Sequence, residues 1–218
     1  MPWVLGYGSL LHPDSLRRTL PHVKKGGIRP VRVGGTRRIF NLVSPGWAKL
    51  AGGVRGRRVA ALNAVPATEA RMNAVAFFLE EEEIGPLDRR EFCYEKIKNV
   101  PFADWGKLPV ECSAEPENGL YYSVMDAAKL KARFPQRYRD EYQPLGADGL
   151  LSDDVLPQED YLSVCLQGAR LWGDDFLTFF LRHTLLADGR TTLDHYLQGE
   201  ALERHLQADV AAILTRRG

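Results

Sequence analysis

The chain has 218 residues, of which 44% are hydrophobic and 26% are charged. These ordinary fractions can bury a sizeable core, either as one large domain or as a core with a helical extension. No run of about 18 apolar residues is present, and the N-terminus lacks a charged segment leading into an apolar one, so we expect neither a membrane span nor a secretory signal. We therefore expect a cytoplasmic protein.

The cysteines and histidines do not form a pattern that binds metal. The three cysteines are widely spaced, at Cys93, Cys112 and Cys165, and no two of them form a CxxC pair. The sequence therefore indicates neither a disulfide framework nor a metal site with thiolate ligands. The five histidines are scattered without the spacing of a zinc site. We expect no metal.

Charge is balanced over the whole chain but not along it. Residues 1–60 contain 12 lysines and arginines against one acid, Asp14, which leaves 17 bases and 27 acids in the remainder. The bases occur singly or in pairs without a nucleic-acid-binding motif, so we expect no nucleic-acid partner. A positive rim that attracts small anionic substrates is the milder interpretation.

A turn that contains two glycines follows the first apolar segment, in the sequence WVLGYGSLL at residues 3–11. The apolar start predicts a buried strand, and Gly6 and Gly8 permit a close ligand approach that a Cβ atom would prevent. A strand, this turn and a helix beginning near Pro13 would aim several backbone N–H groups at one anion. A tight turn without any ligand is the alternative.

Two other glycine motifs do not match this turn. The dinucleotide fingerprint GxGxxG lacks its third glycine, and the nucleophile elbow GxSxG lacks the glycines it needs around Ser9. Ser9 is therefore a poor candidate nucleophile.

Extended segments come first along the chain and helical patterns follow. We predict strands at residues 30–43, 59–65, 72–79, 92–100 and 120–124. A short helix is expected at residues 87–91, with Pro86 at its first position. Longer helices are predicted at residues 126–134, 161–172, 176–186 and 200–214. This order predicts an α+β fold rather than an alternating parallel sheet.

Glu91 is the candidate for acid–base chemistry. In a short helix Leu87 and Glu91 share a face, so the leucine anchors the turn and the carboxylate leans toward the interior. The negative end of the helix would raise the pKa of Glu91, as a general base near neutral pH requires. The alternative is an exposed acid paired with Arg89 or Arg90.

Three motifs resemble segments of the γ-glutamylcyclotransferase-like family, which includes a glutathione-specific ChaC branch. The YGSL sequence at residues 7–10 resembles the substrate loop, and LDRRExxY at residues 87–94 resembles the catalytic-glutamate segment, with Glu91 at the matching position. The pattern PxxxYxxxxxxGAxxxG near the end of the family's core is reproduced by Pro157, Tyr161, Gly168, Ala169 and Gly173. The motifs come in the family's order and cover most of the chain.

The resemblance implies a small mixed β-barrel-like sheet with flanking helices over residues 1–175, and a helical extension over residues 176–218 packed on it. It also implies which residues contact the substrate: Tyr7, Gly8, Ser9, Leu10, Tyr122 and Tyr161. In the LYYSV strand Tyr121 matches as well as Tyr122 does, so either could face the pocket.

The implied activity is cleavage of a γ-glutamyl amide by attack of its own α-amine, with Glu91 as the catalytic base. The products are 5-oxoproline and a free amine or amino acid. No cofactor is implied, and the partner is a small γ-glutamyl molecule such as glutathione, a γ-glutamyl amino acid or a γ-glutamylamine.

The sequence departs from the family's pattern in two places, which leaves open how the departing amine or amino acid of the substrate would be bound. The segment after Glu91 lacks a glycine that many members carry, and residues 136–156 are longer than compact members need. Another reaction in the same pocket, or a non-catalytic binding or scaffold module of the same fold, stays an alternative. The sequence leaves the oligomeric state open.

Overall fold

The computed structural model describes residues 2–23, 27–50, 58–106, 117–145 and 150–216. Its strands are β1 (Trp3–Gly6), β2 (Ile28–Val43), β3 (Ala60–Phe78), β4 (Tyr94–Asp104), β5 (Glu117–Val124) and β6 (Thr184–Leu186). Its helices are α1 (Pro13–Arg17), α2 (Pro45–Leu50), α3 (Glu81–Arg90), α4 (Ala127–Arg133), α5 (Pro135–Arg137), α6 (Glu159–Arg170), α7 (Asp174–Arg182), α8 (Leu193–Tyr196), α9 (Glu200–Leu206) and α10 (Val210–Arg216). Shorter helical turns are η1 (Ser9–Leu11), η4 (Tyr138–Tyr142) and η5 (Gln143–Leu145). Cys112 lies outside the described residues.

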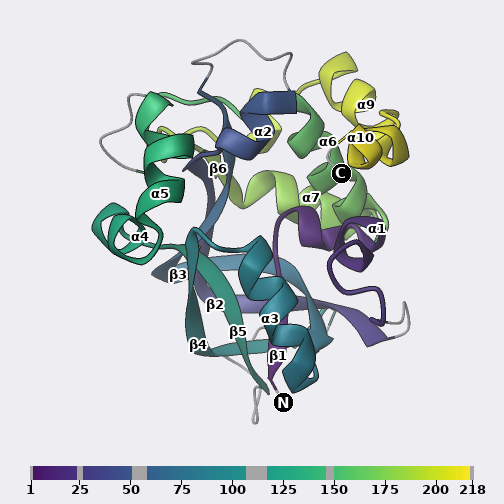
Figure 1. Ribbon diagram of the computed structural model, residues 1–218. Coiled ribbons are helices and arrows are strands. Elements are labelled where there is room, and N and C mark those ends of the chain that lie inside the picture. The colour runs from purple at the N-terminus through teal and green to yellow at the C-terminus, as the bar shows by residue number, and fades with distance from the viewer. Residues whose placement is uncertain (1, 24–26, 51–57, 107–116, 146–149, 217–218) are drawn as a thin grey trace.

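Five strands close into a mixed barrel. Their order is β3-β1-β5-β4-β2, and β2 pairs back with β3 to complete the ring. The β1–β5 pair is parallel and the other pairs of the ring are antiparallel. Figure 1 shows the barrel in the lower part of the molecule, with α3 across its front and the C-terminal helices beside its upper end. The predicted α+β fold and the barrel-like sheet are confirmed.

The two longest strands bend as they pair. β2 and β3 run antiparallel from Ile28↔Phe77 to Val43↔Ala60, with register shifts between Gly34 and Thr36 and again after Ile39. The separate strands predicted at residues 59–65 and 72–79 are one strand, β3. Residues 66–71 lack the buried pattern that marks a strand. β2 pairs with Arg71 and Pro66 at the two ends of this segment, and the register shift between Gly34 and Thr36 lies opposite the residues between them.

The helix before Glu91 is longer than predicted. α3 begins at Glu81, and the Glu83 carboxylate accepts a hydrogen bond from the Glu80 N–H at 2.9 Å, which stabilises the N-terminal turn. Pro86 therefore lies inside the helix rather than at its first position. The acidic run that the sequence places before Pro86 forms the helix start.

The predicted C-terminal helices are also revised. The helix expected at residues 176–186 ends at Arg182, and Thr184–Leu186 forms β6, which pairs in parallel with Arg38–Phe40 of β2. The helix expected at residues 200–214 is two helices, α9 and α10. The proposed boundary at residue 175 stays a prediction, although β6 joins the sheet and α7 contacts β3. No helix in the described ranges is both long and apolar enough to span a bilayer.

Arg38 on β2 is completely buried and joins several of these elements. Its guanidinium donates to Thr184 Oγ1 at 2.8 Å, and to the backbone and side-chain oxygens of Asn73 at 2.7 and 2.8 Å. It also donates to the Tyr7 carbonyl at 3.4 Å and lies 3.9 Å from the centre of the Phe180 ring. Burial lowers the pKa of Arg38 to about 9, so it stays charged at neutral pH.

We predict that Arg38→Met lowers the free energy of unfolding by about 3–5 kcal/mol, because the buried oxygens of Asn73 and Thr184 lose their donor. Arg37, the exposed neighbour on the same strand, provides the control, and Arg37→Met should stay within about 0.5 kcal/mol of the parent. Urea denaturation followed by circular dichroism measures both. Equal stability of the two variants would show that this network does not hold the fold together.

Candidate active site

Three cavities meet at Glu91 and Tyr94, which line all of them. The largest, about 270 Å³, extends toward α2 and the α5–η4 segment. A second, of about 160 Å³, lies between α3, β4 and α4. The smallest, about 30 Å³, is lined by the YGSL turn and by Tyr122 and Tyr161. The carboxylate of Glu91 therefore lies at a junction of cavities.

Glu91 occupies the end of α3 as the sequence predicts. Its N–H bonds the carbonyl of Leu87 at 2.9 Å, and Leu87 is fully buried and anchors this turn. The Glu91 carboxylate is only 15% exposed and pairs with Arg90 Nε at 3.1 Å. It is thus an acid paired with Arg90, but in a largely buried position. The arginine favours its charged form and the helix end favours its neutral form.

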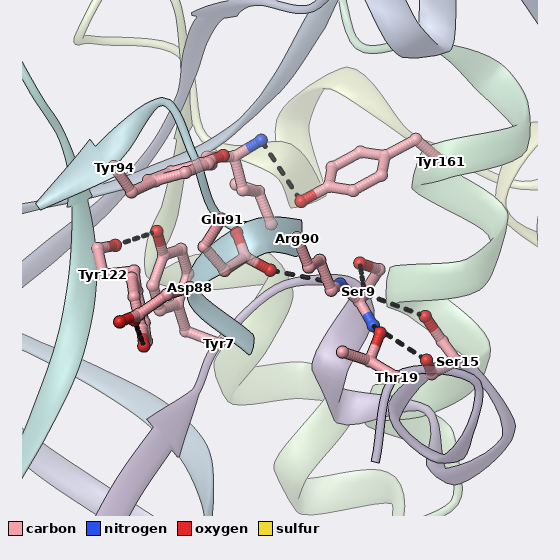
Figure 2. A network of polar contacts seen from close by, with 11 residues as sticks. Tyr7, Ser9, Ser15, Thr19, Asp88, Arg90, Glu91, Tyr94, Tyr122 and Tyr161 are labelled. Atoms are coloured by element: carbon pink, nitrogen blue, oxygen red, sulfur yellow. Dashed lines mark hydrogen bonds and ion pairs between the residues drawn. The ribbon is translucent and has the colours of Figure 1, made fainter. Parts of the chain in front are cut away.

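Arg90 connects α3 to the YGSL turn and the helix that follows it. One terminal nitrogen donates to the Ser15 carbonyl at 2.8 Å and to Thr19 Oγ1 at 2.9 Å. The other donates to Ser9 Oγ at 3.0 Å and to Ser15 Oγ at 3.2 Å. Figure 2 shows these bonds on one side of Arg90 and Glu91 on the other. The guanidinium therefore fixes the position of the turn relative to the carboxylate.

Ser9 is buried, and its hydroxyl accepts a hydrogen bond from the Arg90 guanidinium at 3.0 Å. An arginine cannot act as a proton acceptor near neutral pH. The geometry agrees with the sequence argument that Ser9 is a poor nucleophile. Cys93, which lines the largest cavity, is also unsuited to attack because burial raises the pKa of its thiol to about 12.

The turn between β1 and α1 is held from both sides. The Tyr7 hydroxyl donates to the Tyr122 carbonyl, and the backbone closes a short turn through the Leu11 N–H to Gly8 carbonyl bond at 2.9 Å. A Cβ atom at Gly8 would lie 2.6 Å from Tyr161 Oη, so any other residue here would displace the Tyr161 hydroxyl. The first N–H groups of such a helical turn have no partner within it and are available to an anionic ligand.

The tyrosines around the turn are fixed by backbone and carboxylate groups. Tyr94 Oη donates to the Leu62 carbonyl at 3.0 Å, and Tyr161 Oη accepts from the Leu62 N–H at 3.4 Å. Tyr122 Oη donates to Asp88 Oδ1 at 2.7 Å. Burial, with a smaller contribution from Glu91, raises the pKa values of the Tyr94 and Tyr161 hydroxyls, which therefore stay neutral near pH 7.

No protein-family model and no curated protein matches this sequence. Solved structures do match it. One is a γ-glutamyl cyclotransferase, which aligns over 94% of this chain and 97% of its own with a TM-score of 0.54 and 11% identity. The chain has the γ-glutamylcyclotransferase fold.

Two further structures support this assignment of the fold. An uncharacterized human protein aligns over 95% of this chain and 98% of its own, with a TM-score of 0.54 and 11% identity. YkqA from Bacillus subtilis aligns over 84% of this chain but 53% of its own, with a TM-score of 0.54 and 13% identity. At such identities a γ-glutamylcyclotransferase fold does not define the chemistry, which has to be argued from the residues of this chain.

The site residues predicted from the sequence come together in the γ-glutamylcyclotransferase fold, while their roles stay predictions. The smallest cavity is lined by Tyr7, Gly8, Ser9, Leu10, Glu91, Tyr122 and Tyr161. Tyr122 lines this cavity, whereas Tyr121 is buried and packs edge-on against Tyr7. Where the sequence allowed either tyrosine, the structure favours Tyr122.

Sequence reasoning considered Arg90 only as a possible partner of Glu91 and gave no role to Tyr94. Tyr94 is the last residue of the LDRRExxY motif and could be recognised as part of it. Its hydrogen bond to Leu62 could not be predicted, because the two residues are 32 positions apart in the sequence. The bonds of Arg90 join residues 71 to 81 positions apart. No local pattern indicates such partners. Within the described ranges, no three His, Cys, Asp or Glu side chains gather as a metal site would require.

We predict that Arg90→Ala lowers the free energy of unfolding by about 2–4 kcal/mol, because Ser9, Ser15 and Glu91 lose a partly buried charged partner. Arg89 is exposed on the same helix, and Arg89→Ala should change stability by no more than about 0.5 kcal/mol. Thermal and urea unfolding of the two variants checks this. A matched loss in both would mean that only helix propensity had changed.

Proposed function

We propose that this protein is a γ-glutamylcyclotransferase-type enzyme that releases 5-oxoproline from a γ-glutamyl amide. The observation that carries the proposal is the position of Glu91, whose carboxylate lies in the same small cavity as the YGSL turn and Tyr161. A general base and a set of backbone N–H donors are the two groups that the reaction requires. The fold of the γ-glutamyl cyclotransferase structure supports the same conclusion.

In the proposed reaction, Glu91 accepts a proton from the α-ammonium of the substrate. The freed amine attacks the γ-carbonyl carbon of the same molecule, and a C–N bond closes the five-membered ring. The N–H groups of the YGSL turn would bind the oxygen that becomes negatively charged. The bond to the leaving nitrogen then breaks as that nitrogen takes the proton from Glu91. The freed Glu91 carboxylate accepts the second proton of the ring nitrogen and passes it to the departing amine or to water, which gives 5-oxoproline and a free amine.

The attack is intramolecular, so the protein mainly has to hold the substrate in its folded conformation. A well-oriented intramolecular reaction gains up to about 7–11 kcal/mol over a bimolecular one. The hydrogen-bonded tyrosines and the YGSL turn suit such a role, because they line the same cavity as Glu91. In the scaffold alternative, Glu91 would serve only as the structural partner of Arg90.

The decisive experiment is Glu91→Gln. The amide is nearly isosteric but cannot accept the proton, so release of 5-oxoproline from γ-glutamyl compounds should fall by about 10²–10⁴-fold. Mass detection of 5-oxoproline across a panel of γ-glutamyl amino acids and γ-glutamylamines measures the loss. Glu82→Gln, an exposed change on the same helix, is the control and should keep full activity. Turnover by Glu91→Gln within a few-fold of the parent would exclude Glu91 as the base.

Tyr161 tests whether α6 belongs to the site. Its ring packs against Trp47 and Phe40 at centroid distances of 5.0 and 6.1 Å, and these contacts survive in Tyr161→Phe. The lost hydroxyl contact is long, so the melting temperature should change little. We expect kcat/KM to fall by about tenfold or more, which corresponds to about 1–3 kcal/mol for a hydrogen bond to a ligand or charged group. Unchanged kinetics with a lower melting temperature would instead mark Tyr161 as structural.

A further inference from the structure

The largest of the three cavities extends beyond Ser9 and Glu91 to residues outside the YGSL turn. Its lining includes Trp47 of α2, Phe92, and Arg137 and Tyr142 of the α5–η4 segment. Its volume of about 270 Å³ is just under the ~300–1,000 Å³ typical of sites for drug-sized ligands. There is room for a small group attached to the reacting carbonyl.

Arg137 brings a positive charge to this wall in a fixed orientation. Its Nε donates to Glu141 Oε1 at 3.1 Å, and its guanidinium carbon lies 3.5 Å from the centre of the Phe92 ring. These two contacts hold the guanidinium plane but use only one of its three nitrogens. Within the described part of the chain, neither terminal nitrogen donates a hydrogen bond. A planar carboxylate binds such a pair of nitrogens with two parallel hydrogen bonds.

The other charges at this cavity are already paired. Arg90 binds Glu91, and Glu141 binds Arg137 through Nε. The carboxylates of the smaller neighbouring cavity of about 160 Å³ are paired too, Asp88 with Lys96 and Glu95 with Lys129. The terminal nitrogens of Arg137 suit an anion.

We propose that the 270 Å³ cavity is the leaving-group subsite and that it selects γ-glutamyl amides of α-amino acids with an apolar or aromatic side chain over amides of simple amines. Arg137 binds the carboxylate of the departing amino acid. Trp47 and Phe92 contact its side chain, since aromatic rings favour apolar and aromatic partners. The inference rests on the proposed function and adds to it the class of leaving group and the residue that recognises it.

The test uses two substrates that differ only in this carboxylate, γ-glutamyl-phenylalanine and γ-glutamyl-phenethylamine. Release of 5-oxoproline gives kcat/KM for each substrate. We expect kcat/KM to be about ten times higher for γ-glutamyl-phenylalanine, because one charge-assisted hydrogen bond at a partly exposed arginine contributes about that factor. Arg137→Met should bring the ratio close to one. Arg137→Lys keeps the charge but loses the planar fork, and it should retain part of the preference.

The matched control is Arg139→Met, an exposed change in η4 at a residue that does not line the cavity, and it should leave the ratio at the parent value. Because the Arg137 side chain is 46% exposed, its replacement should leave the fold intact, which thermal unfolding verifies. Equal kcat/KM for the two substrates in the parent protein, or an unchanged ratio in Arg137→Met, would overturn the inference alone. Absence of 5-oxoproline from both substrates would overturn the proposed function and the inference with it.

Discussion

A single buried cation connects the parts of this fold that create the site. Arg38 lies on β2 and binds β3 through Asn73, the first strand's turn through the Tyr7 carbonyl, and β6 through Thr184. Asn73 in turn donates to the Phe176 carbonyl of α7 at 2.7 Å. A buried charge is tolerated only where several acceptors surround it, so the barrel, the turn and α7 have to be positioned together. The base of the YGSL turn is set by this requirement.

A second arginine, Arg90, holds the YGSL turn in position relative to α3. Arg90 lies between the Glu91 carboxylate and the oxygens of Ser9, Ser15 and Thr19. It offsets the charge of the carboxylate and also fixes its distance from the backbone N–H groups. The turn is thus held between one arginine beneath it and one beside it. A preorganised polar site of this kind does not need to rearrange when charge develops on a ligand.

The sequence predicted the local features of this protein and missed those that depend on distant partners. The YGSL turn, Glu91 at a helix end, Tyr161 and the α+β order depend on neighbouring residues or short motifs, and each was recognisable. The distant partners of Arg38 and Arg90 could not be predicted, because in a linear sequence these are two bases among 29, and the partners are up to 146 positions away. The segment at Thr184–Leu186 read as helix for the same reason. Its strand form depends on pairing with β2 and on the Arg38 bond to Thr184, and such tertiary contacts override local propensity.

The position of Glu91 between the cavities suits the proposed reaction, in which protons pass from the attacking nitrogen to the leaving nitrogen on the same carbon. In ring closure the attacking and leaving nitrogens both reach the γ-carbonyl carbon, so a carboxylate beside that carbon can serve both. The barrel and α3 hold Glu91 and the turn in place, whereas the wall around Arg137 comes from the connection after β5 and α4. In the proposed reaction, chemistry and selection of the leaving group thus belong to different segments, and the α5–η4 wall can change without moving the proposed base.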